Sequence, residues 1–159
     1  MKPVRVLLVE DSPVHQRLLL AAFKEAPQVR VEAHADAESA WAALNGLIAS
    51  PLAQWPDFAL IDIGLPGASG IELVDRIRQS RHFEELPLLV LTASEDPEDQ
   101  TESLLARADG FFRKPATPSG YASLVKGILG FLGDGTAPKK ATRRARTAVS
   151  KAGRTDPSS

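Results

Sequence analysis

The sequence predicts an α/β fold, a five-stranded parallel sheet with helices on both faces. Strand-like and helix-like patterns alternate along residues 1–133 in five βα units. The run Val4–Val9 is rich in branched apolar residues, with no polar alternation beyond Arg5, as expected for a strand buried on both faces. Parallel strands are joined by right-handed crossovers, which place the helices on the two faces of the sheet.

The five predicted strands are short apolar runs bounded by polar residues, glycine or proline. They are Val4–Val9, Val29–Ala33, Phe58–Ile63, Pro87–Thr92 and Gly110–Arg113. The second run alternates with Arg30 and Glu32, which predicts a more exposed strand.

Two helices are predicted before the third strand. Ser12 is a plausible N-cap and Pro13 suits the first helical position, where its missing N–H costs nothing. The apolar residues at helical spacing that follow are Val14, Leu18, Ala21 and Ala22. Asp36 is the expected N-cap of the second helix, which is predicted to continue through Ile48 until the segment from Ser50 to Pro56 breaks it.

Three more helices are predicted in the second half. One follows a loop rich in Gly and Pro at 64–70 and turns Ile71, Val74 and Ile77 inward. A weaker one begins at Asp96 and Pro97 and ends near Ala108. The last carries the most regular apolar stripe, formed by Tyr121, Leu124, Val125, Ile128, Leu129 and Leu132.

Composition and charge divide the chain into a domain, residues 1–133, and a basic tail, 134–159. The chain has 159 residues and a net charge of −1, but 134–159 carry seven basic and two acidic residues. This tail has little to bury and is predicted to be disordered. Its basic residues could contact nucleic acid or an acidic partner, but without aromatic residues for stacking a solvated extension is the favoured interpretation. The absence of cysteine excludes disulfides and thiol catalysis and suits a cytoplasmic protein. No run is long and apolar enough for a membrane span.

Polar residues follow or end four of the predicted strands. Glu10 and Asp11 come after the first, Asp62 after the third, Thr92 after the fourth and Lys114 after the fifth. The carboxyl ends of parallel strands share one edge of the sheet, where ligands bind, so these side chains are expected to converge. Carboxylate oxygens suit Mg²⁺.

This set of groups predicts phosphoryl transfer to an aspartate. The Asp62 carboxylate is the candidate nucleophile, which would form an acyl phosphate. Mg²⁺ and Lys114 would neutralise charge on the phosphoryl oxygens, and the Thr92 hydroxyl would bond one of them.

These motifs resemble the response regulator receiver domain family over roughly residues 3–132. The matching segments are Leu7–Pro13, Asp62–Gly70, Leu91–Ala93 and Lys114-Pro115. The resemblance implies a flavodoxin-like, CheY-like sheet in the order 2-1-3-4-5. It also implies that a histidine kinase phosphorylates Asp62.

The resemblance further implies a role for each site residue. Asp11 and Asp62 would bind Mg²⁺ directly, Glu10 through water and Gly64 through its backbone carbonyl. Thr92 would be the switch hydroxyl and Lys114 would pair with the phosphoryl group, with a Lys114–Pro115 bond that is usually cis in the family. Phe111 stands at the position of the switch aromatic residue. Often this residue is Tyr, and Phe cannot hydrogen-bond there.

A narrower resemblance points to the stand-alone regulators paired with bacterial phytochromes. It rests on the long segment Leu47–Gln54 and on Arg81–Pro87. It implies a bacteriophytochrome-type histidine kinase as partner and a homodimer through the fourth helix, fifth strand and last helix. The three histidines (15, 34 and 82) have no ligand spacing and are interpreted as ordinary surface or packing residues.

Three functions compete at this stage. The first is a single-domain phosphoacceptor switch, which is not an enzyme beyond catalysing its own phosphorylation and dephosphorylation. The second is a small phosphatase or phosphotransferase with Asp62 as nucleophile. Such enzymes commonly carry an acid two residues further on, where this chain has Gly64. The third is a binding module that never uses phosphate, which the complete set of site residues disfavours.

Overall fold

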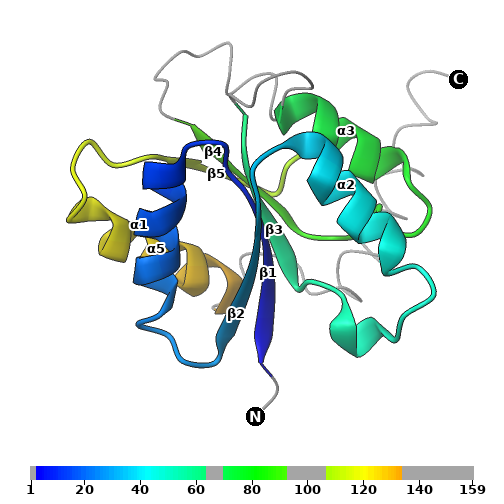
Figure 1. The fold of residues 1–159 in the computed structure, drawn as a ribbon, viewed down its shortest axis with the longest axis horizontal. Coiled ribbons are helices and arrows are strands. Elements are labelled where there is room, and N and C mark those ends of the chain that lie inside the picture. The colour runs from blue at the N-terminus through cyan, green and yellow to red at the C-terminus, as the bar shows by residue number, and fades with distance from the viewer. Residues whose placement is uncertain (1–2, 64–69, 93–106, 134–159) are drawn as a thin grey trace, which may run out of the picture.

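Residues 3–63, 70–92 and 107–133 are described by a computed structural model, and they confirm the predicted fold class (Figure 1). Five parallel strands form one sheet in the order β2-β1-β3-β4-β5. The strands are β1 Val4–Val9, β2 Val29–His34, β3 Phe58–Asp62, β4 Leu88–Thr92 and β5 Gly110–Arg113. Two strands match the predicted bounds and the other three differ by one residue at one end, which is the usual uncertainty of element ends.

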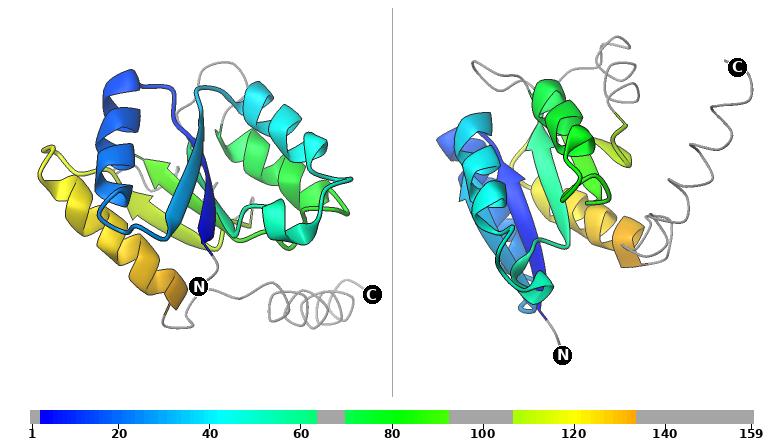
Figure 2. Two further views of the ribbon diagram at one scale, coloured as in Figure 1. Left: turned by 60° about the horizontal axis from the view of Figure 1, so that its bottom comes forward. Right: turned by 90° about the vertical axis from the view of Figure 1, so that its right-hand side faces the viewer.

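The helices cover both faces of the sheet. They are α1 Pro13–Phe23, α2 Ala37–Gly46, the short 3-10 helix η1 Leu52–Gln54, α3 Gly70–Gln79 and α5 Gly120–Gly133. Figure 1 shows α1 and α5 on one side of the strands and α2 and α3 on the other. The left view of Figure 2 shows α1 and α5 side by side, in agreement with their mutual contacts. The helix predicted to begin at Asp96 falls largely within 93–106, outside the described residues.

Two hydrophobic cores lie on opposite faces of the sheet. Alternate residues of a strand point to opposite faces: Leu7 and Val9 join the core shared with α2 and α3, whereas Val6 and Leu8 join the core shared with α1 and α5. Every residue of β3 and β4 is buried, as expected for central strands, and β2 is the more exposed strand that its polar residues predicted.

The start of α1 is as predicted, and so is part of its inward face, since Ala22 is buried and Leu18 packs against the core. The Ser12 hydroxyl accepts a hydrogen bond from the His15 N–H at 3.2 Å, and Pro13 occupies the first turn. Val14, which was expected to lie on the inward apolar face of the helix, is 59% exposed. Ala21 is exposed too, because the helix turns Leu19 and Phe23 toward the sheet; these larger side chains bury more apolar area than alanine.

Helix α2 ends at Gly46, two residues before the predicted end at Ile48. The indole N–H of Trp55 lies 2.7 Å from the Leu47 carbonyl and 3.1 Å from the Ser50 carbonyl. Pro51 has no N–H to donate to the Leu47 carbonyl, so the helix could not use this carbonyl, and the Trp55 side chain supplies a donor to it. Ile48 is left 37% exposed.

The inward faces of α3 and α5 are as predicted. Val74 and Ile77 of α3 are buried, as are Tyr121, Val125 and Ile128 of α5. In the part of the chain that the structure describes, no helix is both long and apolar enough to cross a membrane. The basic tail at 134–159 lies outside the described residues.

Candidate functional site

The polar residues predicted at four strand ends meet at the carboxyl edge of the sheet. Glu10 follows β1, Asp62 ends β3, Thr92 ends β4 and Lys114 follows β5. Backbone hydrogen bonds hold neighbouring strand ends in register: the Lys114 N–H donates to the Thr92 carbonyl at 2.7 Å, and the Glu10 N–H to the His34 carbonyl at 2.9 Å. The side chains of this edge are therefore positioned by the sheet itself.

Three carboxylates form a cluster at this edge. Oxygens of Glu10, Asp11 and Asp62 all lie within 4.8 Å of one another. Glu10 is 0% exposed and Asp62 is 6% exposed, whereas Asp11 is exposed. The Ser12 N–H donates to Glu10 Oε2 at 3.1 Å, which orients the buried carboxylate.

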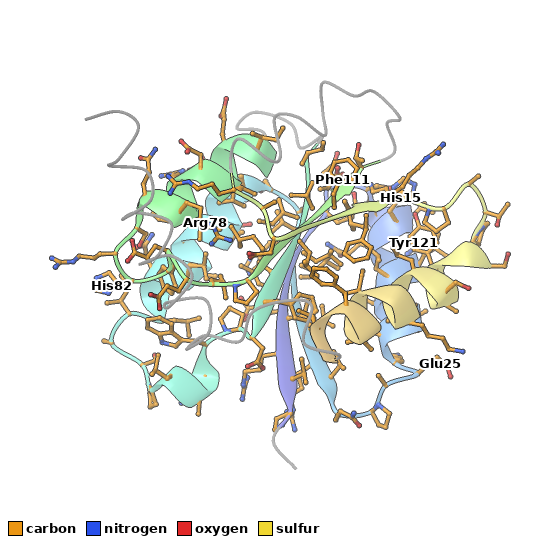
Figure 3. The ribbon with its side chains drawn as sticks, turned by 180° about the vertical axis from the view of Figure 1, so that it is seen from behind. His15, Glu25, Arg78, His82, Phe111 and Tyr121 are labelled. Carbon is orange, nitrogen blue, oxygen red and sulfur yellow. The ribbon has the colours of Figure 1, made fainter. Side chains whose placement is uncertain are left out.

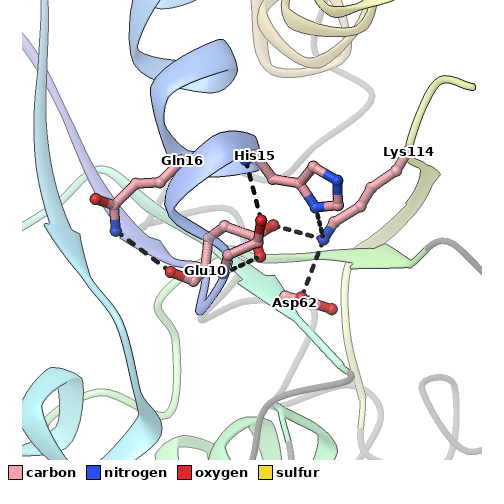
Figure 4. Close-up of polar contacts among 6 residues, drawn as sticks. Glu10, His15, Gln16, Asp62 and Lys114 are labelled. Atoms are coloured by element: carbon pink, nitrogen blue, oxygen red, sulfur yellow. Dashed lines mark hydrogen bonds and ion pairs between the residues drawn. The ribbon is translucent and has the colours of Figure 1, made fainter. Parts of the chain in front are cut away.

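Lys114 links this cluster to α1. Its Nζ lies 2.6 Å from Glu10 Oε1, 3.0 Å from Asp62 Oδ2 and 3.1 Å from Nδ1 of His15 (Figure 4). Its side chain is only 6% exposed. The ammonium is thus held directly beside the candidate nucleophile, where it can neutralise charge on a group bound to Asp62.

The ionisation of the site follows from burial and mutual charge. Burial raises the pKa of Glu10 to about 7 from an ordinary value of 4.5; the Asp62 charge acts in the same direction, and the contacts with Lys114 and the Ser12 N–H oppose it. Burial alone would lower the pKa of Lys114, but the Glu10 hydrogen bond and the charge of Asp62 outweigh it and raise that pKa. Lys114 is therefore the cation of the site, and two buried carboxylates share it.

The acidic cluster fits a divalent metal ion. Glu10 Oε1 is buried, and the contact that it makes is the 2.6 Å ion pair with the Lys114 ammonium. Three carboxylates against one ammonium leave net negative charge, and oxygen ligands of this kind suit Mg²⁺. Glu10, Asp11 and Asp62 are the described residues that would hold the ion. Gly64, predicted to add its carbonyl, lies outside the described residues.

The structure also places both predicted switch residues. Thr92 is 3% exposed at the end of β4. Phe111 of β5 is half-buried, lies opposite Val90 in the register and packs against the core shared with α2 and α3.

One expectation about the site is wrong. The Lys114–Pro115 bond, expected to be cis, is trans, since no peptide bond among the described residues is cis. Trans is the lower-energy form even before proline, by about 0.5–1 kcal/mol, and Lys114 reaches both carboxylates from it.

Sequence reasoning missed the contact between His15 and Lys114. His15 had been interpreted as an ordinary surface or packing residue, but its ring nitrogen lies 3.1 Å from the Lys114 ammonium. One signal was available: Ser12 caps the helix that follows β1, so the first turn of that helix borders the carboxyl edge of the sheet. A polar residue in this turn is close to the site.

Comparison with known proteins agrees with the fold and the site described above. Residues 6–126 match the model of the response regulator receiver domain. The crystal structure of a phosphorylated cyanobacterial phytochrome response regulator, RcpA, has a TM-score of 0.76 and 28% identity, and the match covers 86% of this chain and 99% of that one. The Mn²⁺-bound form of response regulator Rcp1 has a TM-score of 0.72 and 28% identity, over 82% of this chain and 94% of that one.

Among curated relatives, the phosphate regulon transcriptional regulatory protein PhoB of Escherichia coli (strain K12) is 30% identical over 125 residues. The match covers 79% of this chain and 51% of PhoB. The chain thus spans about half the length of the curated relatives it matches.

Proposed function

This chain belongs to the response regulator receiver domain family, and from that premise we propose that Asp62 accepts a phosphoryl group from a histidine kinase. The proposal rests on the groups that surround the Asp62 carboxylate. Lys114 Nζ lies 3.0 Å from it, and the other two carboxylates of the cluster are within 4.8 Å. A nucleophilic oxygen, a fixed cation and a cation-binding cluster are the parts that phosphoryl transfer needs.

The transfer is a displacement at phosphorus. An Asp62 carboxylate oxygen forms the new bond to phosphorus, and the bond from phosphorus to the donor's imidazole nitrogen breaks. That nitrogen keeps the electron pair, and because the donor reacts with a proton on its other ring nitrogen, as a phosphoimidazolium, the ring leaves as neutral imidazole. Mg²⁺ held by Glu10, Asp11 and Asp62 would neutralise charge on the phosphoryl oxygens, and the Gly64 carbonyl would complete its ligands.

Within this chemistry Lys114 has a defined role. Its ammonium lies between two carboxylates and is buried, so water screens its charge little. It can move from Asp62 Oδ2 to an oxygen of the phosphoryl group with little reorganisation. The expected product is a phosphoaspartate whose charge is shared by Lys114 and the metal.

The domain acts as a switch rather than as a turnover enzyme. Phosphorylation would shift the population toward an arrangement in which Thr92 bonds a phosphoryl oxygen and Phe111 repacks. Both residues are within two strands of Asp62, because β3 pairs with β4 and β4 with β5. Phe111 has no hydroxyl, so its rotamer change is driven by packing alone.

We also propose a phytochrome-type histidine kinase as the partner and the cytoplasm as the location. The support is similarity to RcpA, whose structure is that of a phytochrome response regulator. A homodimer through the predicted fourth helix, β5 and α5 is part of the same proposal. β5 is an edge strand with only half-buried or exposed residues, as a strand that pairs with a second copy would have. Sedimentation velocity with and without acetyl phosphate tests it, and a monomer in both conditions contradicts it.

The experiment for the main proposal is phosphorylation by acetyl phosphate with Mg²⁺, followed by intact-mass spectrometry. We expect one added phosphoryl group on the wild-type protein and none on Asp62→Asn. Asp75→Asn is the matched control, since Asp75 is an exposed carboxylate on α3 outside the cluster. Modification of Asp62→Asn at the wild-type level would refute the assignment. Transfer from a purified candidate kinase then tests the partner.

A further inference from the structure

His15 is held in a fixed place beside Lys114. It lies in the first turn of α1, where its own N–H donates to the capping Ser12 hydroxyl at 3.2 Å. Its ring lies near that of Tyr121 on α5, with centroids 6.3 Å apart and an interplanar angle of 31°. Figure 3 shows His15 and Tyr121 together, and Figure 4 shows the His15 ring directed at the Lys114 ammonium. The backbone and one neighbouring ring therefore fix its position.

The contact has only one possible direction. A lysine ammonium carries three N–H donors and no acceptor. At 3.1 Å from Lys114 Nζ, His15 Nδ1 must therefore be the acceptor and carry no proton. In the neutral ring the proton is then on Nε2.

We propose that His15 is a positioning residue, which holds the Lys114 ammonium in line with Asp62 for phosphoryl transfer; this inference rests on the proposed function. Among the described residues, the ammonium has three partners: Glu10, Asp62 and His15. The two carboxylates belong to the cluster that would bind the metal ion, and their charges are shared with it. His15 is the partner without charge, so it orients Lys114 without competing with the phosphoryl group for its positive charge.

The surroundings of His15 allow this role. His15 and Lys114 line an open hollow of about 640 Å³ together with Arg113, Gly120 and Leu124. The ring is thus packed against Tyr121 on one side and accessible on another. Lys114 can give up its contact with Asp62 to a phosphoryl oxygen while its contact with His15 remains.

Three variants test the proposal with acetyl phosphate and Mg²⁺ near pH 8, where an ordinary histidine is neutral. His15→Leu removes the acceptor. We expect phosphorylation of Asp62 to be slower by about three- to tenfold, because a hydrogen bond to a charged, half-exposed group contributes a free energy of that size. His15→Asn places an amide oxygen near the position of Nδ1, and the rate should return to within about twofold of wild type. His82→Leu is the matched control, because His82 is exposed and lies far from the site (Figure 3).

The outcomes separate positioning from mere packing. A wild-type rate in His15→Leu would overturn the proposal, and so would equal slowing in His15→Leu and His15→Asn, which would mean that only the ring volume matters. The affinity for Mg²⁺, measured by calorimetry, should be the same in all four proteins, since the contacts of His15 within the described residues are with Ser12, Lys114 and Tyr121 and not with a carboxylate of the cluster. An affinity that falls as much as the rate would place His15 in the metal site instead.

A spectroscopic measurement is independent of phosphorylation. Long-range ¹H–¹⁵N spectra of the histidine rings report the tautomer, and we expect the proton of neutral His15 on Nε2. A proton on Nδ1 would contradict the contact and the proposal with it. If wild-type protein takes up no phosphate while His15 has the expected tautomer, the proposed function fails and the positioning of Lys114 stands.

Discussion

The guanidinium of Arg78 and the carboxylate of Asp109 form an ion pair of 2.8 Å inside the protein, with side chains 2% and 4% exposed. Arg78 ends the buried face of α3, and Asp109 precedes β5. The same carboxylate accepts the Leu88 N–H at 2.8 Å, and Arg78 Nη1 donates to the Leu86 carbonyl at 2.7 Å. The pair therefore joins α3 to the amino ends of β4 and β5, at the opposite end of the sheet from the acidic cluster.

Removing one partner of this pair should destabilise the fold strongly. Asp109→Ala leaves the Arg78 guanidinium buried without its counter-charge and the Leu88 N–H without its acceptor. We expect the free energy of unfolding to fall by about 3–5 kcal/mol. Urea denaturation followed by circular dichroism measures this.

The exposed ion pair between Arg76 and Glu38 is the control. Its atoms are 3.3 Å apart and its side chains are 45% and 69% exposed. Glu38→Ala should therefore cost about 1 kcal/mol or less. Equal losses in Asp109→Ala and Glu38→Ala would show that burial of the Arg78 pair has no energetic consequence.

Gly70 should be intolerant of any side chain. A Cβ at this position would lie 2.6 Å from the Ile63 Cα and still closer to the Asp62 carbonyl oxygen, so the backbone after β3 would have to move. We expect Gly70→Ala to lower the free energy of unfolding by about 1–3 kcal/mol and to slow phosphorylation of Asp62. Both are measurable by urea denaturation and by the acetyl phosphate assay.

The comparison variant is Gly127→Ala in α5. Nothing lies within 4 Å of a Cβ there, and alanine should stabilise the helix by up to about 1 kcal/mol. If Gly70→Ala were as stable and as active as Gly127→Ala, the close approach of Gly70 to Asp62 would have no role.

The stability of the metal-free protein should depend on the ionisation of Glu10. Its pKa is about 7 in the folded state and near 4.5 ordinarily, so between these pH values the folded state holds a proton that the unfolded chain has released. By linkage, the contribution of Glu10 to stability is present in full below about pH 4.5 and is lost as the pH rises through about 7. Urea midpoints measured in EDTA across this range should fall less steeply for Glu10→Gln than for wild type.

The affinity for Mg²⁺ should change with pH in the opposite direction to the stability of the metal-free protein. Mg²⁺ is bound by ionised carboxylates, so its affinity should increase as the pH rises toward about 7, where Glu10 loses its proton. Calorimetric titration at several pH values measures this, and Glu25→Gln, an exposed carboxylate, is the control. The stability prediction is contradicted if Glu10→Gln keeps the wild-type pH dependence of the urea midpoint in EDTA, because a group other than Glu10 would then cause that dependence.

The strands and the acidic cluster could be predicted because their signals are local. A strand buried on both faces is an apolar run, and its end marks the carboxyl edge of the sheet, so Glu10, Asp62 and Lys114 were predicted to converge. The end of α2 was placed two residues too late, because Leu47 and Ile48 continue the apolar pattern beyond the last helical residue. The Trp55 indole that bonds the Leu47 carbonyl comes from eight residues further along the chain, so no residue of the helix indicates that contact.

Contacts between residues far apart in the sequence could not be predicted from the sequence pattern either. The partners His15 and Lys114 are 99 residues apart, and Arg78 and Asp109 are 31 residues apart. Each residue alone fits an ordinary surface position by its type. The fold brings the first turn of α1 next to the residue after β5, and the end of α3 next to the residue before β5.

Lys114 should matter for phosphoryl transfer and not for holding the metal ion. Lys114→Met keeps most of the side-chain volume but removes the charge beside Asp62 and Glu10. We expect phosphorylation by acetyl phosphate to slow by about 10- to 100-fold, because a preorganised donor to the phosphoryl oxygens is lost. The affinity for Mg²⁺ should rise, since the three carboxylates would no longer share a cation. Lys126→Met on the exposed face of α5 controls for loss of a lysine, and weaker Mg²⁺ binding in Lys114→Met would mean that this ammonium organises the cluster instead of competing with the metal.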